Sequence, residues 1–139
     1  MNSGGPTDEQ LDVLIDHARS ARAASYAPYS GFLVGAAVLA GGRTFVGVNV
    51  ENASYPMSMC AERNAIAAAI AAEERVIDAI AVVGGSAEPA PPCGGCRQVL
   101  WEVGSQAIVV SELPEGARRR WTIQELLPDA FDRTALGER

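Results

Sequence analysis

The sequence contains little that would suit a membrane, a secretion route or a nucleic-acid partner. No apolar run approaches the roughly 20 residues that cross a bilayer, and residues 1–6 lack the basic and apolar segments of a signal peptide. Aromatic residues make up only 6% of the chain, and its formal net charge is −6. Since nucleic-acid sites usually combine a basic groove with stacking aromatics, we expect a cytoplasmic protein with neither nucleic acid nor membrane as a partner.

Cysteine and histidine are also scarce, with three and one among the 139 residues. An odd number of cysteines cannot form a complete disulfide framework within one chain, and clustered cysteines in a reducing compartment more often bind metal or catalyse. The sequence has no P-loop and no G-x-G-x-x-G motif to bind a nucleotide cofactor. The cysteines are therefore the strongest functional signal in the chain.

Length and composition indicate one domain over residues 1–139. The chain is 48% hydrophobic and 20% charged, which is typical of a soluble domain with a single core. We expect residues 1–6 to be a flexible N-terminus and residues 132–139 to be a loose C-terminal tail.

Hydrophobic periodicity and turn residues predict the order helix, two strands, helix, strand, helix, strand, helix. Capping boxes begin the first helix at Thr7 and the last at Thr122, and Gly41-Gly42 predicts a hairpin turn. This order favours an α/β fold in which a mixed sheet lies between helices. The longer helices are predicted over residues 7–24, 59–74 and 94–103, and the strands over residues 32–40, 43–50, 77–83 and 107–111.

Two stretches of unusual composition carry further expectations. The second helix should start at a Ser58 cap and be buried on most faces, because residues 65–72 are only Ala and Ile. The run Arg118-Arg119-Arg120 is expected to be a solvated face.

The cysteines have the spacing of a catalytic zinc site. Cys60, Cys93 and Cys96 can supply three thiolates to one zinc ion and leave the fourth tetrahedral position for water. Glu62 follows the first of them by two residues, close enough to exchange protons with that water. This arrangement, Cys-x-Glu followed by Pro-Cys-x-x-Cys, is the known signature of zinc-dependent nucleobase deaminases. Arg63 can donate hydrogen bonds to the thiolates and offset their surplus negative charge.

Two other interpretations of the cysteines stay open at this point. The C-x-x-C pair could be a redox motif, although Cys60 would then be left over. The three thiols could instead hold a structural zinc, but such sites are usually closed by four ligands. The only candidate for the fourth is His17, which lies between Asp16 and Arg19 on a helix face that is expected to be solvated.

A second cluster of polar residues follows the second predicted strand. Asn49 and Glu51 point to the same side of an extended chain, and an amide beside a carboxylate suits the vicinal hydroxyls of a ribose. Phe32 could form a wall for a flat base. Taken alone, the cluster is better explained as an Asn-rich turn, and Phe32 could equally be an ordinary core residue.

Together these residues resemble the small homotetrameric cytidine deaminases over almost the whole chain. The resemblance implies a three-layer α/β/α fold with a five-stranded mixed sheet, and one Zn²⁺ per chain bound by the three cysteines. It is carried by Tyr26-Ala27-Pro28-Tyr29-Ser30, Val34-Gly35-Ala36-Ala37, Gly47-Val48-Asn49-Val50-Glu51-Asn52-Ala53-Ser54-Tyr55-Pro56, Cys60-Ala61-Glu62-Arg63, Pro92-Cys93-Gly94-Gly95-Cys96-Arg97-Gln98-Val99 and Glu125-Leu126-Leu127-Pro128.

The resemblance also implies a role for each site residue. Glu62 is the catalytic proton shuttle, and Arg63 tempers the charge of the thiolates. The substrate-binding positions are Phe32 beside the pyrimidine, Asn49 and Glu51 on the ribose, Ala61 at the base edge, and Tyr55 and Phe131 reaching the site of a neighbouring subunit.

The implied reaction is the hydrolytic deamination of cytidine and 2′-deoxycytidine to uridine, 2′-deoxyuridine and ammonia, in pyrimidine salvage. Another cytosine nucleoside such as blasticidin S is the alternative substrate, because its deaminase shares the cysteine segments. A non-catalytic zinc-stabilised protein is the remaining alternative. The intact run from Asn49 to Tyr55 favours the cytidine branch, whereas Gly31 and Met57-Ser58-Met59 depart from the family pattern beside the expected site.

Overall fold

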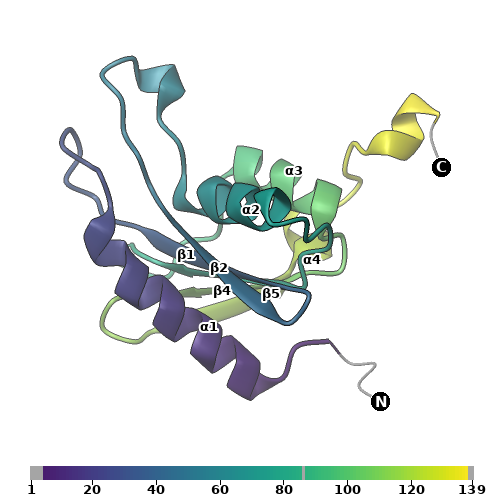
Figure 1. Cartoon of the computed structure of the whole chain (residues 1–139), viewed down its shortest axis with the longest axis horizontal. Helices are drawn as coiled ribbons and strands as arrows, with labels where there is room; N and C mark the ends of the chain where they lie inside the picture. Colours follow the sequence, from purple (N-terminus) through teal and green to yellow (C-terminus); the bar gives the residue numbers. More distant parts are fainter. Residues whose placement is uncertain (1–4, 86, 138–139) are drawn as a thin grey trace.

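The computed structural model describes residues 5–85 and 87–137 and forms three layers. A five-stranded sheet in the order β2-β1-β3-β4-β5 lies between α1 on one face and α2, α3 and α4 on the other (Figure 1). Only β3 and β4 are parallel, and the other neighbours are antiparallel. The predicted α/β/α fold with a mixed sheet is confirmed. The strands are β1 Gly35–Ala40, β2 Arg43–Val48, β3 Ala79–Val83, β4 Ile108–Glu112 and β5 Arg118–Thr122; the helices are α1 Asp8–Ala21, α2 Ala61–Ala71, α3 Gly94–Val103 and α4 Ile123–Leu126.

Helix α1 covers one face of the sheet and begins where the sequence predicts. The Thr7 side chain accepts a hydrogen bond from the Gln10 backbone, and the Gln10 side chain bonds back to Thr7, which completes the capping box. After Ala21 the helix tightens into a 3₁₀ turn that ends at Ala24. Its buried face, Leu11, Leu14, Ile15 and Ala18, packs on Ala37, Ala79, Ala81, Val83 and Val110 of the sheet.

The β1–β2 hairpin closes through Gly41 and Gly42 as predicted, with φ of 59° and 76°. Positive φ at both turn positions is what a tight two-residue hairpin requires. Strand β1 begins at Gly35, three residues later than expected. The preceding residues bond instead to the side chain of Asn49, which accepts from Val34 N and donates to Phe32 O.

Helix α2 differs from its prediction at the start and on its outer face. The predicted Ser58 cap is wrong, because the helix starts at Ala61 and the Ser58 hydroxyl accepts a hydrogen bond from Asn52 N at 3.1 Å. Burial on most faces is confirmed except on the outer side, where Ala67 and Ala71 are exposed. The side toward the sheet is buried, and the two exposed alanines line a groove with Val99 and Val103 of α3.

The run Arg118-Arg119-Arg120 forms an edge strand that the residue pattern alone did not predict. It pairs antiparallel with β4, and its cations bond to acids of the neighbouring elements. Arg118 reaches both Glu112 at 2.7 Å and Asp12 at 2.8 Å. These pairs let a charged segment join the sheet while its side chains stay about half exposed. The expected solvated face is therefore confirmed, but it belongs to a strand and not to a loop.

The segment after α4 lies along α3. The Gln98 side chain donates a hydrogen bond to Phe131 O at 2.7 Å, and residues Arg133–Leu136 form a 3₁₀ turn whose cap is Asp132. The looseness predicted for residues 132–139 stays a prediction, and residues 138–139, like residues 1–4, lie outside the described part. Within that part, no helix is both long and apolar enough to cross a membrane.

Candidate metal centre and adjoining cavity

The three thiols meet at one point between α2 and α3. Cys60 stands immediately before α2, Cys93 immediately before α3, and Cys96 in the first turn of α3. The Sγ atoms of Cys60 and Cys93 are 3.8 Å apart, those of Cys93 and Cys96 are 3.5 Å apart, and all three lie within 4.8 Å of one another. A tetrahedral zinc with Zn–S bonds of about 2.3 Å separates two thiolates by about 3.8 Å. The cluster therefore fits zinc without rearrangement.

The surroundings of the thiols already favour negative charge. Cys60 and Cys93 occupy the N-cap positions of their helices, where the helix dipole stabilises a thiolate. A hydrogen bond from Cys96 lowers the pKa of Cys60 to about 5, and Arg63 acts in the same direction. The resulting charge on Cys60, together with burial, raises the pKa of Cys96. These surroundings therefore favour the thiolate form of Cys60.

Arg63 lies against this cluster, as the sequence predicts. Its Nη2 is 3.7 Å from Cys60 Sγ. Among residues 5–85 and 87–137, Arg63 Nε is the only fully enclosed side-chain nitrogen or oxygen that has no hydrogen-bond partner. A fixed cation beside three thiolates offsets their surplus charge and so keeps a bound metal electron-poor.

Glu62 is buried beside the thiols and faces the same space. Only 7% of the residue is exposed, although it sits in the first turn of a helix. Burial raises the pKa of its carboxyl group to about 7. A carboxyl group with a pKa near neutrality can both take and give a proton at physiological pH, which suits a general acid–base catalyst.

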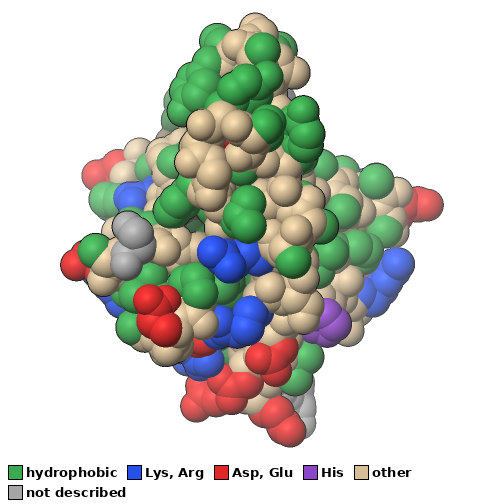
Figure 2. Space-filling model, turned by 90° about the vertical axis from the view of Figure 1, so that its left-hand side faces the viewer, with side chains coloured by type: hydrophobic (Ala, Val, Ile, Leu, Met, Phe, Trp, Pro, Cys, Tyr) green, Lys and Arg blue, Asp and Glu red, His purple; other side chains and the backbone are tan. Residues whose placement is uncertain are grey.

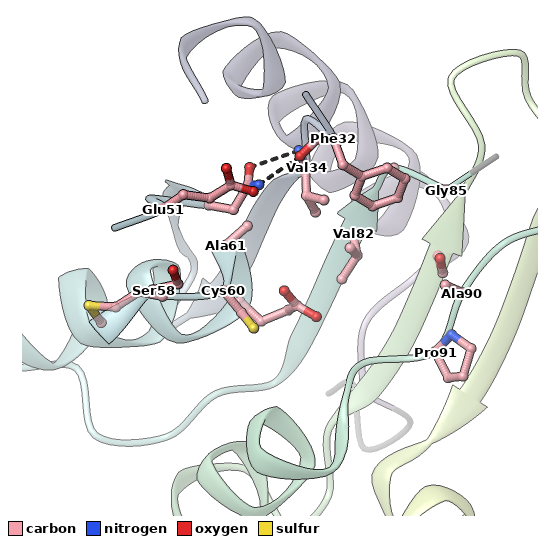
Figure 3. Close-up of a pocket in the computed structure, with 15 residues that line it drawn as sticks. Phe32, Val34, Glu51, Ser58, Cys60, Ala61, Val82, Gly85, Ala90 and Pro91 are labelled. Atoms are coloured by element: carbon pink, nitrogen blue, oxygen red, sulfur yellow. Dashed lines mark hydrogen bonds between the residues drawn. The ribbon is translucent and has the colours of Figure 1, made fainter. Parts of the chain in front are cut away.

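A cavity of about 300 Å³ opens next to Cys60 and Glu62. In Figure 3, Glu51 lies on one side of it and Pro91 on the other, with Val82 between them. The walls are largely apolar, and the volume is at the lower end of the range for small-molecule sites. Such a cavity suits a small, flat, mostly uncharged ligand.

Asn49 and Glu51 both line this cavity, which agrees with their predicted common side. The amide of Asn49 holds the Phe32–Val34 segment, as described above (Figure 3). The carboxylate of Glu51 accepts hydrogen bonds from the backbone of Tyr29 and Ser30 and from the Ser30 hydroxyl, and these bonds lower its pKa. Both side chains are thus fixed in position at one end of the cavity.

The structure also brings Phe32 and Ala61 to the cavity but leaves Tyr55 and Phe131 away from it. Tyr55 is 78% exposed and Phe131 is 60% exposed. Tyr55 belongs to the segment between β2 and α2, which projects from the body of the molecule and carries many of the hydrophobic side chains seen at the top of Figure 2. Within one chain neither residue lines the cavity, although Tyr55 O accepts a hydrogen bond from the backbone of Ser58, which does.

Two residues considered from the sequence do not reach the metal centre. His17 is exposed on α1, which covers the opposite face of the sheet, so it cannot close the cluster as a fourth ligand. Gln98, two residues after Cys96, also points elsewhere, because its amide donates a hydrogen bond to Phe131 O. With no fourth Cys, His, Asp or Glu ligand grouped with the thiols among the described residues, the closed structural-zinc interpretation loses its support. The convergence of Cys60 on the C-x-x-C pair disfavours the redox interpretation.

Sequence reasoning missed the floor and far wall of the cavity. The cavity is also lined by Val82 on β3, Pro91 in the loop between β3 and α3, and Ser111 on β4. Apolar residues of a buried strand carry no functional signal in a sequence. Ser111 alone offered a hint, as an uncharged polar residue at the end of an otherwise apolar strand.

Comparisons with known proteins agree with this geometry. The family model of the cytidine and deoxycytidylate deaminase zinc-binding region matches residues 8–112. The chain belongs to this deaminase family. Its zinc-binding region contains the three thiols that the structure brings together.

Relatives within the deaminase family resemble the chain over most of its length. A cytidine deaminase of Halalkalibacterium halodurans is 44% identical over 122 residues, which cover 86% of this chain and 92% of that protein. The crystal structure of cytidine deaminase from Burkholderia pseudomallei matches with a TM-score of 0.84 and 47% identity, over 91% of this chain and all of that one. The Mycobacterium tuberculosis enzyme matches with a TM-score of 0.77 and 39% identity, over 91% and 98% of the two chains.

Proposed function

We propose that this chain is a zinc-dependent cytidine deaminase that converts cytidine and 2′-deoxycytidine to the corresponding uridines and ammonia. The observation that carries the proposal is a three-thiol cluster of zinc-binding dimensions with the buried carboxyl of Glu62 beside it, on the wall of a nucleoside-sized cavity. Relatives named cytidine deaminase at 44% and 41% identity support the choice of substrate.

Cys60, Cys93 and Cys96 would hold the metal in this proposal. When bound, zinc supplies a Lewis acid that activates water for attack on C4 of the base. Glu62 would take a proton from the attacking water and deliver it to N3. It would then take the remaining proton of the attacking oxygen and deliver it to the 4-amino group, which leaves as ammonia. Its burial supports this role, because a pKa near 7 lets one carboxyl act first as base and then as acid.

The nucleoside would lie with its ribose toward Glu51 and its base beside Phe32. The Glu51 carboxylate is already oriented by three donors from residues 29 and 30. Its Oε1 accepts two of them, whereas Oε2 accepts only the Ser30 hydroxyl and keeps a lone pair for a ribose hydroxyl. Asn49 contributes by fixing the backbone on both sides of Leu33, which sets the position of the Phe32 ring. The backbone of Ala61, at the start of α2, is available to the base edge.

The functional unit in this proposal is a homotetramer in the cytoplasm, with active sites at subunit interfaces. Exposed apolar residues support association: Tyr55 and Met57 on the projecting segment, Phe131 near the C-terminus, and the open face of α2. Tyr55 and Phe131 would complete a neighbour's cavity rather than their own. Three unpaired cysteines support a reducing compartment.

The test is zinc content together with the fall in cytidine absorbance after the purified protein is added. We expect about one zinc per chain and turnover of both cytidine and 2′-deoxycytidine. Zinc without turnover of either nucleoside would contradict the substrate assignment. Blasticidin S and modified cytidines would then be assayed under the same conditions.

A further inference from the structure

Most polar side chains that line the cavity already have partners within the protein. Asn49 and Glu51 bond to the segment that carries Phe32, and the Ser58 hydroxyl accepts from Asn52 N. Cys60 belongs to the metal centre. Two polar lining residues remain. Glu62 has the role proposed above, and Ser111 has no role assigned so far.

The Ser111 hydroxyl opens onto the cavity without a partner. The residue is only 1% exposed, and its side chain makes no hydrogen bond within residues 5–85 and 87–137. The Ser111 hydroxyl is not fully enclosed by protein atoms. Among the same residues, Arg63 Nε is the only side-chain polar atom that is both fully enclosed and without a partner. A hydroxyl on the wall of a cavity, with no partner in the protein, takes its hydrogen bond from whatever occupies the cavity, which is water or a bound ligand.

The sheet places Ser111 at the end of the cavity opposite the ribose residues. Residues Val48, Gly35, Val83 and Glu112 form one row across β2, β1, β3 and β4. Asn49 and Glu51 follow the first member of this row, and Ser111 precedes the last. Three strand spacings of about 4.8 Å each put β4 about 14 Å from β2 across the sheet, so Ser111 and the ribose residues lie on opposite sides of the cavity.

The position of Ser111 across the sheet from Asn49 and Glu51 determines which group of the nucleoside lies near it. In cytidine the ribose is attached to N1, and C4 lies directly across the ring from N1. With the ribose held near Glu51, the group on C4 points to the far end of the cavity. The neighbours of Ser111 there, among them Val82, Ala90 and Pro91, offer apolar side chains.

We propose that Ser111 is a specificity-determining residue whose hydroxyl accepts a hydrogen bond from the 4-amino group of the substrate. This inference rests on the proposed function and assigns the far end of the cavity to recognition of the amine that will leave. In an apolar setting an amino group without an acceptor would lose the hydrogen bonds it made to water. Ser111 supplies the acceptor and so favours cytosine over bases that lack the amine.

The test compares Ser111→Ala with the wild type on two ligands. One is cytidine, followed by steady-state kinetics; the other is the riboside of 2-pyrimidinone, which lacks the 4-amino group, with its Kd measured by calorimetry. We expect kcat/KM for cytidine to fall about 3- to 10-fold, the size of one neutral hydrogen bond, and the Kd of the pyrimidinone riboside to change less than 2-fold. Ser111→Thr keeps the hydroxyl and should restore most of kcat/KM.

Each other outcome overturns a defined part of this inference. Equal losses on both ligands would mean that Ser111 only shapes the cavity, and no loss on cytidine would mean that its hydroxyl does not touch the substrate. Failure of Ser111→Thr to restore activity would also contradict a role for the hydroxyl. A wild-type protein that leaves cytidine unchanged would overturn the proposed function itself and this inference with it.

Discussion

Replacing Gly47 with alanine tests whether contact between β2 and α2 sets the geometry of the site. Gly47 lies on β2 directly under α2, and a Cβ at this position would be 2.4 Å from Ala65 N and 2.5 Å from Ala61 O. Both atoms are backbone, so no side-chain rotation can relieve the clash. Ordinary contact at about 3.4 Å requires α2 to move away from the sheet by about 1 Å.

The expected loss of activity and stability depends on which residues this movement of α2 displaces. Ala61 lies between Cys60 and Glu62, so a shift of α2 moves both a proposed metal ligand and the proposed catalytic carboxyl relative to α3. Forced overpacking of this kind costs about 1–3 kcal/mol of stability. A misplacement of about 1 Å at a catalytic group can lower the rate on the order of 100-fold. We therefore expect Gly47→Ala to lose kcat/KM far beyond what its loss of stability explains.

The assay measures unfolding in urea and cytidine turnover of the folded, zinc-loaded protein for the same samples. Gly104→Ala is the matched control, since its Cβ would lie 2.8 Å from Ile77 O at the C-terminal end of α3, away from the cavity. The control should lose stability but keep kcat. Near-normal kcat/KM in Gly47→Ala, or equal losses of kcat in both variants, would refute the reasoning.

Two further substitutions separate the metal centre from the ribose end. Cys93→Ala should release zinc and lower the melting temperature, because the ligands join α2 to α3; full zinc occupancy by atomic absorption would contradict this. Glu51→Ala should raise KM for cytidine roughly 10-fold or more, because an anionic acceptor of hydrogen bonds is lost, while zinc content stays unchanged. Unaltered kinetics on both cytidine and 2′-deoxycytidine would remove Glu51 from ribose binding.

Local signals in the sequence predicted most of the fold. The Thr7 and Thr122 capping boxes and the Gly41-Gly42 turn all form as expected, because each depends on neighbouring residues alone. Strand β5 was missed for the opposite reason. Arg118 is held by Glu112 and Asp12, the latter 106 residues away in the chain, and no local pattern reveals such a partner.

The candidate site also contains residues that the sequence predicts and a residue that it does not. The three cysteines and Glu62 were predictable, because metal ligands and a nearby carboxylate leave a spacing that chemistry constrains. The structure brings the thiols together as expected, while the functional roles of the individual residues stay predictions. Ser111 could not be assigned from the sequence, since its place in the cavity depends on the strand order that sets β4 beside β3.

The most direct test of the account is cytidine turnover by Glu62→Gln, measured with zinc content on the same preparation. The substitution keeps the size and polarity of the side chain but removes its ability to take up and release a proton. Glu115→Gln, at an exposed position in the β4–β5 turn, is the matched control. We predict about one zinc per chain in every sample, with turnover lowered about 10²- to 10⁴-fold in Glu62→Gln alone. Near-normal turnover by Glu62→Gln with zinc in place would contradict the account.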